Sequence, residues 1–180
     1  IIQEHFSDIN ARVARLDAEI NKLVSEYESQ IALLCTIPGV DRNLAITIIS
    51  EIGTDMSEFG SSKRLCRWAG LTPGNNESAG KKKSVRITRA GVYLKPALVQ
   101  AAHAAVKSTK SVYFKSKYEH ISKRRGKKRA IIAIARMILT AVFAMLKTGE
   151  VFHPCDLQKY DMPEQLRRRQ VVSSAKNAVK

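Results

Sequence analysis

The side chains best suited to covalent chemistry lie in one short basic segment. Ser78 stands between Glu77 and the small pair Ala79-Gly80, and several cations follow it closely. Small neighbours would let a phosphate approach the serine hydroxyl, while cations would stabilise charge on the nonbridging oxygens. Ser78 is therefore a candidate nucleophile, and its candidate phosphate contacts are Gly80, Lys81, Lys82, Lys83, Arg86 and Arg89. On residue types alone, a solvated turn is the commoner meaning of such a segment.

Other groups that could take part in phosphoryl chemistry are sparse. The best-placed carboxylates are those of Asp41, Glu51, Asp55, Glu58 and Glu77. They show no motif that would gather three of them around a divalent metal, so we expect helix caps and surface charge and no metal site in this chain. His103 and His120 have no evident partner that would make either a general base, and we expect structural or surface roles.

Positive charge is concentrated in one part of the chain. Residues 81–129 hold sixteen Lys and Arg residues against a single acid, Glu119, while the remaining residues are balanced in charge. Such a concentration is typical of a surface that meets phosphates, so the sequence predicts a nucleic-acid partner. Phosphate contacts do not distinguish DNA from RNA.

The densest basic cluster is the heptapeptide KRRGKKR at residues 123–129. Its candidate nucleic-acid contacts are Lys123, Arg124, Arg125, Lys127, Lys128 and Arg129. A solvated linker is the alternative interpretation. Tyr113, Phe114 and Tyr118 precede the cluster and could stack on unpaired bases, although we expect at least two of them to pack in the core.

The first 34 residues have the pattern of a long amphipathic helix. Apolar residues recur at spacings of four and three, at Ile9, Val13, Leu16, Ile20, Leu23, Tyr27, Ile31 and Leu34. This narrow seam predicts a helical arm that either docks on its own domain or forms a coiled coil with a partner. The second alternative predicts a homo-oligomer, a dimer or higher, assembled through the arm.

A turn follows the arm. Pro38 and Gly39 end the first helix, and Asp41 or Asn43 can cap the next, over residues 44–52. The pattern is similar to a helix-hairpin-helix motif, in which turn amides approach a DNA phosphate, and Gly39 is therefore a further candidate contact. The turn could equally be a packing element.

The remaining segments predict short and long helices with few strands. Ser61 or Ser62 can cap a short helix over residues 63–69, in which Trp68 is expected to anchor the core. Residues 72–83 are expected to form an exposed loop, followed by a brief extended piece at 85–87. Further helices are expected at 89–107, started or kinked by Pro96, at 112–124, and after Gly126 at 128–147.

Together these patterns predict a mainly α fold: a coiled-coil-like N-terminal helix and then a compact helical domain containing a helix-hairpin-helix-like motif. The expected divisions are an arm at 1–34, a domain at 35–152 and a partly ordered tail at 153–180. The three cysteines are far apart, which argues against disulfides and zinc. No secretory signal is seen, and the start without Met suggests a fragment of a longer protein.

The apolar run at residues 130–146 is interrupted by Arg136 and Thr140 and is shorter than the roughly 20 residues of a membrane span. We therefore expect it to be a buried helix. We expect no contact with a membrane, and the separated cysteines are those expected of reduced thiols in a cytosolic protein.

Four segments resemble one known family in order and spacing. They are LCTIPGVDRNLAITIISEIG, FGSSKRLCRWAGLTP, ESAGKKKSVRITRAGVYLKPALVQAA and RRGKKRAIIAIARMILTAVFAMLKTG. Together, over residues 34–152, they resemble the C-terminal domain of the insertion-sequence-110, 116 and 902 transposases, which include Piv-type invertases.

The resemblance implies a role for Ser78, which matches a family serine proposed to attack the DNA phosphate and hold it as a phosphoserine. It also implies a RuvC-like domain outside this chain that binds Mg²⁺, a composite site built from different subunits, and a structured guide RNA. The implied setting is the cytoplasm of a prokaryote, at the nucleoid. Lys82, Lys83 and Pro96 depart from the common pattern.

Two other functions stay open on the sequence. A non-catalytic helix-hairpin-helix module would grip nucleic acid through phosphates and would never form a covalent serine adduct. An interaction module would use the arm to dimerise a partner.

Overall fold

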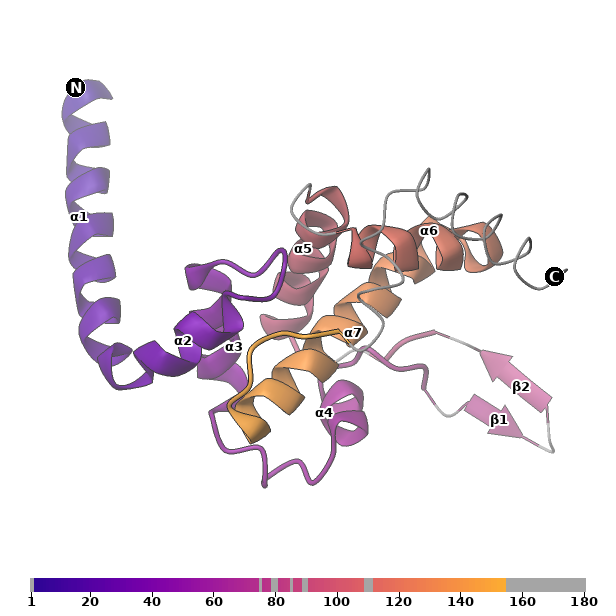
Figure 1. Ribbon diagram of the computed structural model, residues 1–180. Helices are drawn as coiled ribbons and strands as arrows, with labels where there is room; N and C mark the ends of the chain where they lie inside the picture. The colour runs from indigo at the N-terminus through magenta and orange to yellow at the C-terminus, as the bar shows by residue number, and fades with distance from the viewer. Residues whose placement is uncertain are drawn as a thin grey trace, which may run out of the picture.

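The computed structural model describes residues 2–74, 76–78, 81–84, 86–88, 91–108 and 112–154. Over these residues the protein is mostly helical, with one short antiparallel hairpin, which confirms the predicted mainly α fold (Figure 1). In chain order the elements are α1 (Ile2–Leu23), the 3₁₀ helix η1 (Ser25–Tyr27), α2 (Glu28–Leu34), α3 (Arg42–Ile52), α4 (Ser62–Trp68), β1 (Asn76–Ser78), β2 (Lys81–Ser84), α5 (Leu94–Lys107), α6 (Tyr113–Arg125) and α7 (Lys127–Thr148).

Helix α7 forms the centre of the helical body. It packs against α2, α4, α5 and α6, and its buried side chains include Ile134, Ile138 and Val142. Small residues on α5, namely Ala101, Ala102 and Ala105, are fully covered, and α3 packs on the same helix. Burial of the apolar side chains of α7 and α5 stabilises the fold by about 25 cal/mol per Å² of apolar surface removed from water.

By length and composition, α7 is also the one helix in the described residues that could cross a membrane. Its most apolar stretch has a mean hydropathy of 2.0, and half of it is buried inside the protein. A helix covered by α2, α4, α5 and α6 has the environment of a core helix, as the sequence predicted for residues 130–146.

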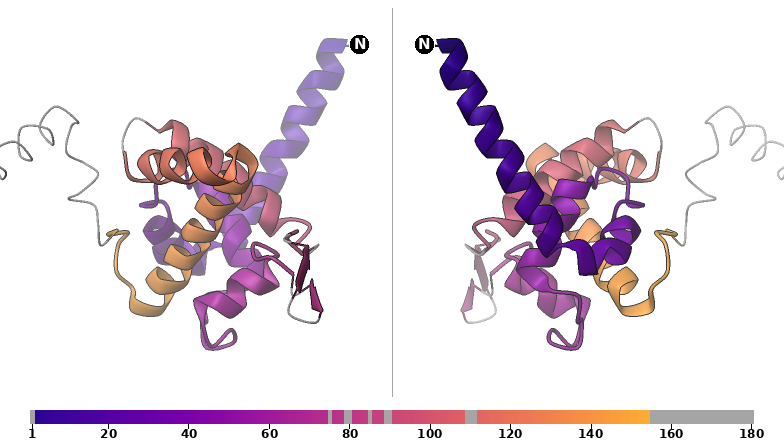
Figure 2. Two further views of the ribbon diagram at one scale, coloured as in Figure 1. Left: turned by 90° about the vertical axis from the view of Figure 1, so that its right-hand side faces the viewer. Right: turned by 90° about the vertical axis from the view of Figure 1, so that its left-hand side faces the viewer.

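Helix α1 is an arm that projects from this body (Figures 1 and 2). None of its residues is buried, and its seam side chains, Ile9, Val13, Leu16 and Ile20 among them, are exposed. Of the two alternatives that the sequence left open, docking of this helix on its own domain is therefore wrong. The coiled coil with a partner stays a prediction.

The long helix predicted from the seam is interrupted after Leu23. The 3₁₀ turn Ser25–Tyr27 redirects the chain, so that Ile31 and Leu34 of α2 enter the core while the α1 seam stays in solvent. The Ser25 hydroxyl donates to the Lys22 carbonyl oxygen at 2.8 Å, a local bond that competes with helix continuation.

Arg42, the first residue of α3, connects three elements near this turn. Its guanidinium donates to the Glu28 carboxylate of α2 and, at 3.2 Å, to Asn21 Oδ1 at the end of α1. The hydrogen bond with Glu28 raises the pKa of Arg42. These contacts link the end of the arm to the domain.

Local capping follows the sequence closely. The Asp41 carboxylate accepts a hydrogen bond from the Leu44 N–H at 2.8 Å and Ser61 Oγ accepts from the Arg64 N–H at 3.3 Å, so both predicted N-caps are confirmed. Pro96 lies in the first turn of α5, where its missing N–H costs little, and the helix starts at Leu94, five residues later than predicted.

The prediction that Trp68 anchors the core is wrong, because its side chain is 47% exposed. Leu65 and Cys66 supply the buried face of the short helix α4. The Trp68 ring instead packs edge-on against Phe59, with centroids 5.6 Å apart. A helix of two turns has room for only one narrow buried face.

Candidate nucleic-acid interface

Ser78 is the last residue of β1 in an antiparallel hairpin. Ser78 pairs with Lys81 and Glu77 with Lys82, and Asn76 pairs with Ser84 after an irregularity. The ribbon continues inward through a bridge between Pro73 and Ile87 and through the Gly74 N–H, which donates to the Arg86 carbonyl oxygen at 2.9 Å. Residues 72–83 were predicted to be a loop, and that prediction is wrong.

The hairpin carries Ser78 away from the helical body (Figure 1). Its strands are separated in sequence by two residues, Ala79 and Gly80, which lie outside the described residues. Gly80 and Arg89 lie outside the described residues, as do the side chains of Ser78, Lys81, Lys82 and Lys83. Their predicted roles stay predictions.

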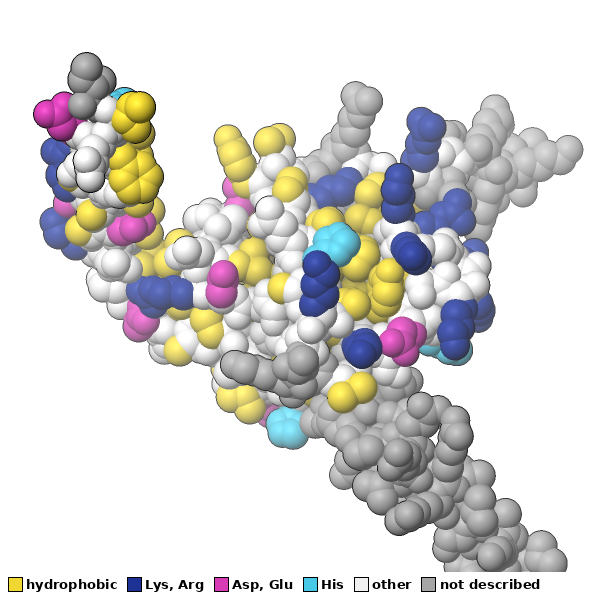
Figure 3. All heavy atoms as spheres, turned by 90° about the horizontal axis from the view of Figure 1, so that it is seen from above, with side chains coloured by type: hydrophobic (Ala, Val, Ile, Leu, Met, Phe, Trp, Pro, Cys, Tyr) yellow, Lys and Arg dark blue, Asp and Glu magenta, His cyan; other side chains and the backbone are white. Residues whose placement is uncertain are grey.

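The basic cluster, residues 123–129, lies at the corner where α6 ends and α7 begins. Gly126 adopts φ +82° between the two helices, and all seven residues are exposed. Figure 3 shows Lys and Arg side chains gathered on the α6 side of the molecule, opposite the arm. The predicted contacts Lys123, Arg124, Arg125, Lys127, Lys128 and Arg129 are thus all exposed at this corner, and Arg125, Lys128 and Arg129 line one groove.

This placement is unfavourable for helix stability. The first turn of α7 holds Lys127, Lys128 and Arg129 and no acid, so three cations face the positive end of the helix dipole. No ion pair within the described part of the chain neutralises any of them. A polyanion bound here would remove this repulsion.

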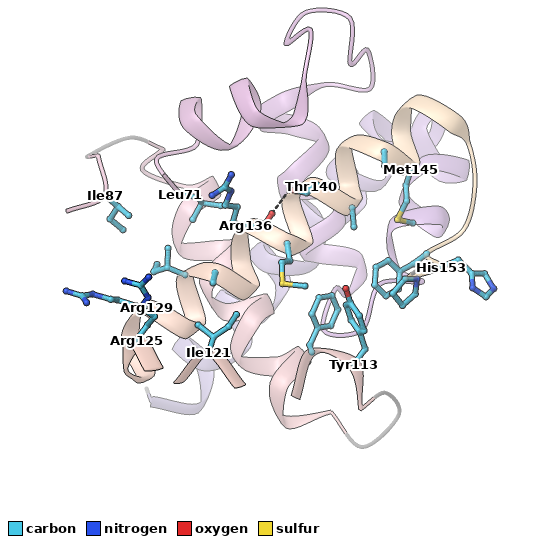
Figure 4. A pocket seen from close by; sticks show the side chains of 18 of the residues that line it. Leu71, Ile87, Tyr113, Ile121, Arg125, Arg129, Arg136, Thr140, Met145 and His153 are labelled. Carbon is cyan, nitrogen blue, oxygen red and sulfur yellow. Dashed lines mark hydrogen bonds between the residues drawn. The ribbon is translucent and has the colours of Figure 1, made fainter. Parts of the chain in front are cut away.

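A groove runs along α7 beside the basic cluster (Figure 4). Its volume is about 1220 Å³, and its walls come from α6, from residues 150–154, and from the base of the hairpin at Leu71, Pro73, Arg86 and Ile87. Arg125, Lys128 and Arg129 of the cluster line it, together with Arg136. The groove thus connects the base of the serine hairpin with the basic cluster.

Arg136 is the groove residue that the sequence reasoning did not identify as a functional candidate. The available signal was an arginine inside the most apolar run of the chain. The aromatic candidates gave the expected result: Tyr113 and Phe114 are buried, and Tyr118 packs partly against the core.

The turn glycine Gly39 has a packing contact. It adopts φ +87°, and a Cβ there would lie 2.5 Å from the Ala105 backbone nitrogen and 2.6 Å from the Ala101 carbonyl oxygen. Glycine is therefore required for the turn to sit on α5. Its predicted phosphate contact, and the helix-hairpin-helix assignment, stay predictions.

The remaining titratable candidates have separate environments. No three His, Cys, Asp or Glu side chains of the described residues gather as a metal site would require. Asp55 accepts a hydrogen bond from the Ser57 N–H at 2.8 Å, which lowers its pKa. His103 and His120 are exposed on α5 and α6, and partial burial raises the pKa of the Cys35 thiol.

Comparison with known proteins identifies the class. Residues 31–119 match the family described as Transposase IS116/IS110/IS902. The chain belongs to this family, as the sequence resemblance predicted.

Individual relatives agree with this assignment. The chain is 30% identical over 154 residues to the pilin gene-inverting protein of Moraxella bovis, covering 82% of the chain and 46% of the relative. It is 27% identical over 134 residues to the transposase for insertion sequence element IS1111A of Coxiella burnetii, covering 73% and 36%. A 43.6 kDa protein of insertion element IS110 from Streptomyces coelicolor is 27% identical over 140 residues, covering 76% and 33%. The chain thus spans less than half the length of these relatives.

Proposed function

We propose that this chain is the serine-bearing part of a DNA transposase or site-specific recombinase, in which Ser78 attacks a DNA phosphodiester. The Ser78 oxygen bonds to phosphorus and loses its proton, the bond from phosphorus to one sugar oxygen breaks, and that oxygen takes a proton. The broken strand is then held as a phosphoserine, and the reverse attack by a new strand end releases the serine.

The observation that carries this proposal is the position of Ser78 at the end of a hairpin whose base opens onto a cationic groove. Cations of the groove and cluster bind the DNA backbone on either side of the reacting phosphate, as they would in any phosphate-binding surface. Membership of a transposase family supports the same reaction class.

Mg²⁺ does not fit the residues described here. Of the carboxylates considered from the sequence, Asp41 caps α3 and Asp55 bonds to the Ser57 backbone, and the described residues form no cluster of three ligands. We place the metal in a RuvC-like domain of the longer protein and assign it no step in this chain. A hairpin that projects from the body is suited to meeting such a domain in another subunit.

A structured guide RNA and oligomerisation through the arm belong to the same proposal. The exposed seam of α1 is the feature that supports assembly. In this proposal the protein acts on nucleoid DNA in the cytoplasm of a prokaryote.

Changing two seam residues to charges, Val13→Asp with Leu16→Asp, is expected to convert the oligomer to a monomer. Carboxylates at adjacent seam positions cannot be desolvated in a coiled-coil interface. Sedimentation of the 180-residue chain measures the change. The matched control is Arg12→Asp with Arg15→Asp on the same helix, away from the seam positions. A wild-type chain that sediments as a monomer at high concentration would contradict assembly through the arm.

Trapping of the covalent intermediate tests the central claim. The full-length protein is incubated with labelled donor DNA, RNA and Mg²⁺ and then denatured. We expect a protein-DNA adduct in the wild type, loss of that adduct in Ser78→Ala, and retention in Ser84→Ala, which removes a serine from the neighbouring strand.

Recombination that proceeds with Ser78→Ala would refute the nucleophile. The hairpin that carries Ser78 would then have a structural role only. A non-catalytic helix-hairpin-helix module that binds nucleic acid would be the better description of the chain. That module binds nucleic acid with a similar salt dependence, so only the adduct separates the two functions.

A further inference from the structure

The groove beside α7 has two unlike surfaces in one space. Figure 4 shows Arg125 and Arg129 together at one end, Tyr113, Met145 and His153 at the other, and Arg136 between them. The floor consists of apolar side chains of α7, among them Ile132, Met137 and Ala141, which are only partly buried. Cations and exposed apolar surface therefore lie within reach of a single ligand.

Arg136 is the most informative residue of this groove. It projects from the middle of an otherwise apolar helix, is exposed, and makes no ion pair within the described residues. Its carbonyl oxygen accepts a hydrogen bond from the Thr140 hydroxyl at 2.9 Å, but no hydrogen bond within the described part of the chain holds its guanidinium. A planar guanidinium can bind a phosphate and can also stack on the face of a base.

The walls of the groove are fixed by contacts to the core. The Phe152 N–H donates to Thr36 Oγ1 at 3.2 Å, and the Phe152 ring stacks on Phe114 with centroids 5.6 Å apart. These contacts hold Phe152, in the middle of the wall formed by residues 150–154, against the helical body. The volume of about 1220 Å³ exceeds the roughly 300–1,000 Å³ of ordinary small-molecule pockets, which favours a segment of a polymer as ligand.

The combination of cationic side chains with an apolar floor favours some polymeric ligands over others. A nucleic-acid duplex presents phosphates and sugars while its base faces stay stacked inside, so the apolar floor would gain little from it. Unpaired nucleotides present both a phosphate and an apolar base face. An acidic peptide offers carboxylates to the groove cations but no flat apolar ring system for the floor, so it matches only one of the two surfaces.

We infer that the α7 groove binds a short run of unpaired nucleotides, with Arg125, Arg129 and Arg136 on the phosphates and the bases on the floor at Ile132 and Met137. This inference rests on the nucleic-acid partner of the proposed function and not on the chemistry of Ser78. DNA and RNA share the required chemistry.

The test measures binding of fluorescent 12-nucleotide oligo(dT) and oligo(U), and of a 12-base-pair duplex, to the 180-residue chain. Met137→Gln keeps the volume and charge of the floor but makes it polar, and we expect single-strand affinity to fall about 3- to 10-fold with less than 2-fold change for duplex. Met137→Leu is the matched apolar control and should bind like the wild type. Arg136→Gln should weaken single-strand binding and lower its salt slope by about 0.7.

Three results would overturn the inference. They are equal losses for single strand and duplex in Met137→Gln, an unchanged single-strand affinity in both Met137→Gln and Arg136→Gln, and displacement of the oligonucleotide by a polyglutamate of equal charge. The ratio of the oligo(dT) affinity to the oligo(U) affinity shows whether the groove prefers DNA or RNA. Failure of the Ser78 adduct would leave these binding results standing, so the two proposals fail separately.

Discussion

Neutralising three cations of the basic cluster, Arg125→Gln, Lys128→Gln and Arg129→Gln, is expected to lower the affinity for duplex DNA about 10²-fold at roughly 0.1 M salt. Each cation that contacts a phosphate releases a counterion, so the slope of log affinity against log salt should fall by about 2.7 for the three together. Fluorescence anisotropy of the 180-residue chain over a series of salt concentrations measures both quantities.

The matched control removes the same net charge from the arm. Arg12 and Lys22 are ion-paired with Asp8 and Glu19, each at 2.8 Å, and Arg15 lies on the same helix. Changing these three to Gln should leave the salt slope within about 0.5 of the wild type. Equal losses in the two triple variants would mean that net charge, and not the cluster, drives binding.

Gly39→Ala is expected to reduce the free energy of unfolding by about 2–4 kcal/mol. The backbone at φ +87° costs about 1 kcal/mol for a residue with a Cβ. The new atom would also lie 2.5 Å from the backbone of α5, where only a shift of the helix relieves the clash, at about 1–3 kcal/mol. Urea denaturation followed by circular dichroism measures the change.

Gly53→Ala is the control for conformational strain alone. Gly53 has φ +68° at the end of α3, and a Cβ there would meet no atom within 4 Å. We expect a loss of about 1 kcal/mol. If both variants lose the same amount, the turn does not depend on close packing against α5.

Elements set by local chemistry were predicted well from the sequence. The caps at Asp41 and Ser61, the break at Gly126 and the buried helix that follows each depend on neighbouring residues, and the structure confirms them. The family was predicted correctly as well, because four segments with fixed spacing carry far more information than any one of them.

Elements whose structure depends on packing against distant parts of the chain were predicted poorly. The seam continues through Tyr27 in the sequence, yet α2 turns away because Ile31 and Leu34 gain burial that an exposed arm could not give them. The hairpin was missed because lysine-rich strands lack the usual apolar alternation, although the Ala79-Gly80 spacing was a usable signal. Arg136 was missed because its meaning depends on the groove that surrounds it.

Arg42 bonds to Asn21 and Glu28 at the base of the arm, so a small change in angle there produces a large displacement at the far end of α1. A helix of 22 residues is about 33 Å long, so a rotation of about 10° at its base moves the far end by about 6 Å. That displacement exceeds the pitch of one helical turn, about 5.4 Å, so in a coiled coil formed by the arm it would change which seam residues pair. In the assembly proposed above, the contacts of the Arg42 guanidinium at the base of the arm would therefore bear on the spacing between two copies.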